Sequence, residues 1–123
     1  MRYLTDRKRA VGMGAAHSGT EHFWGMTVSA VALLILVPLF VFTFGPMLGK
    51  PHAEVVAYFG RPFPAIVAGL TLWVGFMHFK NGIRVAIEDY THGINRKIFI
   101  IGATCLSYAA AATGLFALAR IAL

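Results

Sequence analysis

Three long apolar runs dominate the chain, and short polar stretches separate them. The first run covers about residues 23–44, the second about 65–87 and the third about 98–118. A helix needs roughly 20 mostly apolar residues to cross the hydrocarbon core of a bilayer, and each run reaches this length. The pattern therefore predicts an all-α integral membrane protein with three transmembrane helices. A polar, basic segment at 1–22 precedes them, and residues 1–123 are expected to form one domain.

The composition favours a membrane protein over a soluble domain. The chain is 58% hydrophobic and 13% charged, with a mean hydropathy of +0.69. A soluble domain usually carries about 25% charged residues. The net charge of +6 is compatible with nucleic-acid binding. However, the cations lie between and beside the apolar runs, so a membrane topology signal explains them better. We expect membrane lipid, and no nucleic acid, among the partners.

The distribution of lysine and arginine over the polar segments predicts the orientation of the helices, because cytoplasmic loops are enriched in these residues. Seven cations fall on the side of the N-terminus and three on the opposite side. The first group is Arg2, Arg7, Lys8, Arg9, Arg84, Arg96 and Lys97, and the second is Lys50, Arg61 and Arg120. We therefore expect a cytoplasmic N-terminus, a cytoplasmic loop at Glu88–Lys97 and a C-terminus outside the cytoplasm.

One imidazole, that of His78, lies deep in the second apolar run. Such a group is costly in hydrocarbon unless it binds, donates or relays something. Three interpretations are open: a hydrogen bond to a neighbouring helix, coordination of a metal or haem iron, and proton relay. At about 100° per residue, Gly75 and Gly82 share the helix face of His78. These glycines either leave room for a flat ring or permit close helix packing.

A polar pair, Asp89 and Tyr90, lies near the end of the second run. Asp89 shares the face of His78, about 16 Å farther along the helix axis. The pair is either an ordinary helix end with a tyrosine in the interfacial aromatic belt or part of a functional site. Lys80 and Arg84 point away from this face. We interpret them as snorkelling cations or as contacts to a partner chain.

The other histidines and the acidic residues indicate little further chemistry. The remaining histidines are His17 and His22, near the start of the first run, and His52 and His92, in the predicted loops. Solvation is the expected state of all four. The carboxylates lie at span ends or in loops, so a small transporter is disfavoured. A chain with one deep polar group leaves most of its surface to lipid or partners, which favours a subunit of a larger complex.

The spacing H-(x)10-D-Y, from His78 to Tyr90 on the second of three spans, resembles a known family. It is similar to the small hydrophobic membrane anchor, or cytochrome b small subunit, of succinate dehydrogenase (respiratory complex II). The stretch H-S-G-T-E-H-F-W, where the first run begins, also looks like bacterial members of this family. In layout the resemblance covers nearly the whole chain, but its specific motif spans only 78–90.

The resemblance implies a role for each residue of the motif. His78 matches an axial ligand of haem b, whose opposite ligand would come from a larger cytochrome b anchor subunit. Tyr90 matches a tyrosine that donates a hydrogen bond to a ubiquinone carbonyl, and Asp89 matches an acidic residue beside that site. Gly75 and Gly82 would then pack against the haem.

The resemblance also implies the function of the whole subunit. As part of a heteromeric helix bundle, it would hold the flavoprotein and iron–sulfur subunits at the bacterial inner membrane, with its C-terminus in the periplasm. Electrons from succinate would reach ubiquinone, linking the tricarboxylic acid cycle to the respiratory chain, and the chain alone would not be catalytic. Two alternatives are a fumarate reductase anchor and a haem-free structural subunit of a respiratory membrane complex.

Overall fold

A computed structural model describes residues 3–14 and 18–123 of the chain. Two residues used above, Arg2 and His17, lie outside the described residues. Within the described ranges all regular structure is helical. Three helices are long and apolar enough to cross a membrane. The predicted all-α fold with three transmembrane helices is therefore confirmed, and the chain is a multi-pass membrane protein.

Each long helix extends beyond the apolar run that predicted it. The helices are α1 (Asp6–Val11), α2 (Thr20–Phe44), α3 (His52–Phe59), α4 (Pro62–Tyr90) and α5 (Gly93–Ala122), with a short 3-10 helix η1 at Gly45–Met47. The extensions at the C-terminal end of α4 and at both ends of α5 carry polar residues, whereas α4 begins with Pro62-Phe63-Pro64. Hydropathy alone does not place these ends, because a helix continues past the hydrocarbon core until its backbone is capped.

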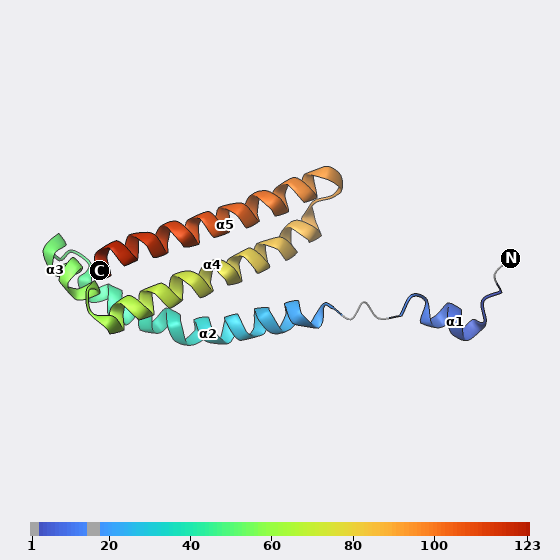
Figure 1. The fold of residues 1–123 in the computed structure, drawn as a ribbon, viewed down its shortest axis with the longest axis horizontal. Helices are drawn as coiled ribbons and strands as arrows, with labels where there is room; N and C mark the ends of the chain where they lie inside the picture. Colours follow the sequence, from blue (N-terminus) through green and yellow to red (C-terminus); the bar gives the residue numbers. More distant parts are fainter. Residues whose placement is uncertain (1–2, 15–17) are drawn as a thin grey trace.

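The three long helices form one open layer with α4 in the middle (Figure 1). α4 packs along α2 on one side and along α5 on the other. Small residues let α5 approach α4 closely, since Ser107 and Ala111 are buried. A Cβ added at Gly114 would lie 3.4 Å from the side chain of Leu72. Such small residues at a contact are typical of helix packing in membranes.

Most large apolar side chains of the layer point outward. Leu34 and Phe42 of α2, for example, are 74% and 77% exposed, and Phe116 of α5 is 67% exposed. In a membrane protein this surface is covered by lipid or by the helices of other chains. The open layer is thus suited to assembly with further transmembrane helices.

The first linker contains a helix that the sequence pattern did not predict. α3 is held by Phe59, which is only 5% exposed and whose ring centroid lies 6.3 Å from that of Phe44 at the end of α2. His52 therefore begins a helix, and the prediction that it lies in a loop was wrong. A hollow of about 530 Å³ between α3 and α5 includes His52 and Arg120 but none of the predicted site residues.

The second linker is shorter than predicted. Only Thr91 and His92 separate α4 from α5, so most of the predicted Glu88–Lys97 loop is helical. The main-chain N–H of Thr91 donates to the carbonyl of Ile87, which ends α4. The side-chain contacts at this turn, described below, explain why so short a connection suffices.

Replacing Phe59 by alanine is expected to release α3 from the layer. Burial of a phenylalanine contributes about 3–5 kcal/mol in a packed core. The amides of α3 should therefore exchange with solvent much faster in the variant, as measured by hydrogen–deuterium exchange on the purified complex. Phe63→Ala, at an exposed phenylalanine, is the control. Equal exchange of α3 in the two variants would contradict this anchoring role.

Candidate functional site

His78 lies half-buried on the side of α4 that packs against α2. Its Nδ1 atom is 2.8 Å from the Oγ atom of Ser29 in α2. The hydrogen bond to a neighbouring helix, one of the three interpretations of this histidine, is therefore present. It uses only one of the two ring nitrogens. Among the described residues, Nε2 has no hydrogen-bond partner, so coordination through Nε2 is compatible with this contact.

The two glycines on the His78 face lie along the same seam between α2 and α4, in different surroundings. A Cβ at Gly82 would lie 3.8 Å from the Cε atom of Met26, in ordinary packing distance of α2. A Cβ at Gly75 would meet nothing within 4 Å. Gly75 instead lines an open groove of about 220 Å³. The other lining residues are Thr71, Leu72 and Phe76 of α4 and Phe40 of α2. The helix surface at Gly75, one turn from His78, is thus open to another group, whereas at Gly82 the side chain of Met26 occupies that space.

Asp89 and Tyr90 are exposed at the end of α4, and Tyr90 has 86% of its surface accessible. In residues 3–14 and 18–123, neither side chain makes a hydrogen bond or an ion pair. Both are therefore available to groups outside this chain. They do not contact His78 directly, which agrees with their predicted separation along the helix axis.

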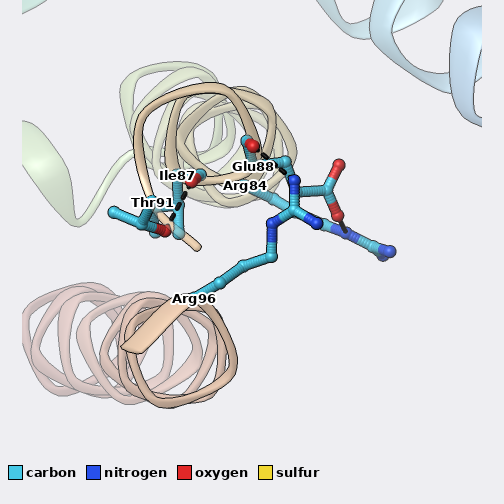
Figure 2. Close-up of polar contacts among 5 residues, drawn as sticks. All are labelled: Arg84, Ile87, Glu88, Thr91 and Arg96. Carbon is cyan, nitrogen blue, oxygen red and sulfur yellow. Dashed lines mark hydrogen bonds and ion pairs between the residues drawn. The ribbon is translucent and has the colours of Figure 1, made fainter. Parts of the chain in front are cut away.

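A cluster of polar contacts fixes the α4–α5 turn next to this pair (Figure 2). The Nε atom of Arg84 donates to Oε1 of Glu88 at 2.9 Å, and Arg96 of α5 donates to the main-chain carbonyl of Glu88. The hydroxyl of Thr91 donates to the carbonyl of Ile87 at 2.6 Å. Arg96 and Thr91 thus donate to carbonyls at the C-terminal end of α4, where positive charge is also favoured, and Arg84 binds the Glu88 carboxylate. The turn thereby holds the end of α4 in place.

Sequence reasoning used Arg96 only as a topology charge and missed this contact. The sequence signal that could have indicated it is a cation in the short polar segment that directly follows the second apolar run. The Nε atom of Arg96 is buried and has no hydrogen-bond partner within the described part of the chain.

Lys80 has a partner in its own chain, on the side of α4 opposite Ser29. Its Nζ atom donates to the hydroxyl of Tyr108 in α5 at 3.1 Å and lies 4.9 Å from the centre of that ring. Arg84 pairs with Glu88 on its own helix. Neither cation thus depends on another chain for a partner.

The other described histidines do not assemble into a site. His22, His52 and His92 are exposed. No group of three or more histidine, cysteine, aspartate or glutamate side chains is placed to hold a metal ion among the residues that the structure describes. A haem iron differs from such an ion, because one protein side chain per face is enough to bind it.

Comparison with known proteins identifies the family of this three-helix chain. Residues 1–117 match the family described as succinate dehydrogenase/fumarate reductase transmembrane subunit. The chain belongs to this family. Over 123 residues this transmembrane subunit is also 48% identical to the succinate dehydrogenase hydrophobic membrane anchor subunit of Paracoccus denitrificans. The match covers all of the chain and 95% of that protein. No solved structure is significantly similar to the chain. The match to the family and to this relative confirms the resemblance noted in the sequence.

Arg96→Ala is expected to loosen the α4–α5 turn. A hydrogen bond from a charged donor contributes about 1.5–3 kcal/mol, so its loss should speed local opening roughly 10- to 100-fold. Hydrogen–deuterium exchange at the last turn of α4, in the purified complex, measures this change. The exposed neighbour Lys97, replaced by alanine, is the control. If both variants exchange like the unmodified protein, Arg96 does not hold this turn.

Proposed function

We propose that this transmembrane subunit anchors a succinate:ubiquinone oxidoreductase and supplies half of a haem b site through Nε2 of His78. The observation that carries the proposal is the position of the imidazole. Its Nδ1 atom is held by Ser29, and Nε2 has no partner among the described residues. The residues fit the group, since a neutral imidazole binds haem iron and the helix surface at Gly75, one turn from His78, is open to a flat ring.

The second half of the haem site would come from outside this chain. The layer of helices is open, and large apolar side chains on α2 and α5 are exposed. A histidine from a larger cytochrome b anchor subunit would supply the opposite ligand. Haem held by two imidazoles has no open coordination position, so it supplies electron transfer rather than oxygen binding.

Asp89 and Tyr90 would contribute to the site where ubiquinone is reduced. The Tyr90 hydroxyl is exposed and can donate a hydrogen bond to a quinone carbonyl. This bond strengthens as negative charge develops on the oxygen during reduction. Asp89, exposed beside it, would organise water that delivers protons from the cytoplasm.

The other subunits would carry the rest of the reaction. A flavoprotein subunit would oxidise succinate, and an iron–sulfur subunit would pass the electrons to ubiquinone. Both would dock on the cytoplasmic face of the bacterial inner membrane. The positive-inside rule supports this orientation, with the N-terminus and the α4–α5 turn in the cytoplasm and the C-terminus in the periplasm. An anchor for a complex that reduces fumarate is the alternative within the same family.

His78→Ala is expected to abolish the b-type haem spectrum of the purified complex, because an axial ligand of the iron is lost. The measurement is the absorption of the reduced minus the oxidised complex. His92→Ala is the control, because this exposed histidine lies between α4 and α5 and should leave the spectrum unchanged. A full haem b spectrum in the His78→Ala complex would contradict the assignment of His78 as a haem ligand.

Tyr90→Phe is expected to slow ubiquinone reduction roughly 10- to 100-fold, the effect of losing one hydrogen bond to a developing charge. Electron transfer from succinate to a water-soluble dye should not change, because the other subunits perform it. Tyr108→Phe, whose hydroxyl contacts Lys80, is the control. Equal quinone reduction by the Tyr90→Phe and unmodified complexes would show that this hydroxyl does not act on the quinone.

A further inference from the structure

We propose that Ser29 is a positioning residue that fixes the tautomer of His78, with the proton on Nδ1 and the free lone pair on Nε2. The inference rests on the proposed function, because it concerns the ring that would bind the haem iron. Its basis is the set of partners around one hydroxyl group. The Oγ atom of Ser29 lies 2.8 Å from the carbonyl oxygen of Gly25, 3.0 Å from that of Met26 and 2.8 Å from Nδ1 of His78.

Counting protons assigns the roles in this group. A serine hydroxyl has one proton to donate and two lone pairs that accept. The carbonyl oxygens of Gly25 and Met26 only accept, so their contacts with Oγ require the serine proton. The contact with His78 is then a hydrogen bond only if Nδ1 carries a proton and donates it to Oγ.

Four other hydroxyls of the long helices support this direction, and a fifth, that of Thr43, donates to the carbonyl three residues earlier in its own helix. Each of the four donates to the carbonyl oxygen four residues earlier in its own helix, at 2.7–2.9 Å; they are Thr27, Thr71, Ser107 and Thr113. This is the usual arrangement of serine and threonine in a membrane helix. Ser29 likewise donates to the carbonyl of Gly25. Its Oγ atom can in addition accept a hydrogen bond from Nδ1 of His78 on the second helix, α4.

The opposite direction brings oxygen atoms into unfavourable contact and leaves an N–H group of the ring without an acceptor. If Ser29 donated to Nδ1, its Oγ atom would face the carbonyl oxygens of Gly25 and Met26 at 2.8 and 3.0 Å with no proton between the oxygens. The hydrogen of the neutral imidazole would then be on Nε2, for which no acceptor lies within hydrogen-bond distance among the described residues. Unpaired polar groups are costly away from water. The observed geometry therefore favours the tautomer whose Nε2 lone pair can bind iron.

Two consequences follow for the haem site. The hydrogen bond from Nδ1 fixes the orientation of the ring and makes the imidazole a stronger electron donor. A stronger donor stabilises ferric over ferrous iron and so lowers the midpoint potential of the haem. α2 thus takes part in the site through Ser29, although the ligand itself lies on α4.

The test compares three variants of the complete, purified complex. Ser29→Ala removes the acceptor, Ser29→Thr keeps a hydroxyl, and Ser107→Ala removes a serine hydroxyl that bonds only its own helix. The readouts are haem per flavin, the midpoint potential of the haem and the electron paramagnetic resonance spectrum of the ferric state. Ser29→Ala should raise the potential and weaken haem binding roughly 10- to 100-fold. The other two variants should resemble the unmodified complex.

Several outcomes would overturn the inference. One is an unchanged potential and haem content in Ser29→Ala; another is an equal change in Ser29→Thr or Ser107→Ala, which would indicate a general packing effect. If Ser29→Ala does not assemble, Ser29→Val is compared with Ser29→Thr, since the two side chains differ only in methyl against hydroxyl. Equal spectra in that pair would also contradict the role of Ser29.

The result for His78→Ala separates this inference from the proposed function. If His78→Ala loses the haem and Ser29→Ala has no effect, only the proposed role of Ser29 is contradicted. If the haem spectrum does not depend on His78, the proposed function of His78 as a haem ligand is itself contradicted.

Discussion

The hydroxyl of Ser29 and the imidazole of His78 meet between α2 and α4, two helices apolar enough to span a membrane, whose hydrocarbon core offers no water as an alternative partner. The serine proton is directed to its own helix, so the histidine must supply the proton of the shared hydrogen bond. One ring nitrogen is thereby used inside the protein, and the other is left for a ligand outside the chain. The proposed haem site, the contribution of α2 and the need for a partner subunit all depend on this contact.

The central helix α4 carries a polar contact on each side. His78 contacts Ser29 of α2, and Lys80 contacts Tyr108 of α5. Two residues on nearly opposite faces of α4 thus link it to the helices on either side. The two broad surfaces of the three-helix layer stay open (Figure 1). Such an arrangement suits a subunit that completes its sites with helices from other chains. The groove at Gly75 lies along the same α2–α4 seam, because Phe40 of α2 also lines it.

Much of this fold is readable from the sequence, because crossing a bilayer imposes a minimum length on each apolar run. The three long helices and the face shared by His78, Gly75 and Gly82 follow from hydropathy and a period of 3.6 residues. Other features depend on contacts between distant residues. α3 is held by the packing of Phe59 near Phe44, and nothing in the linker pattern indicates that contact.

The partner of His78 shows the same limit within the candidate site. Ser29 and His78 are 49 residues apart in sequence, so their contact depends on how α2 and α4 are aligned along each other. Periodicity gives the face of one helix but not its register against another. For the same reason, the two glycines look equivalent in sequence, whereas only Gly75 faces open space. The roles of Asp89 and Tyr90 stay predictions, since both side chains are exposed and make no polar contact within the described part of the chain.

An experimental density map of the complete membrane complex tests the central claim most directly. The account predicts haem iron bound to Nε2 of His78, with Nδ1 still within hydrogen-bond distance of Ser29 and the haem beside Gly75 at the α2–α4 seam. Haem placed against α5, iron bound through Nδ1, or a His78 ring that contacts no haem would contradict it.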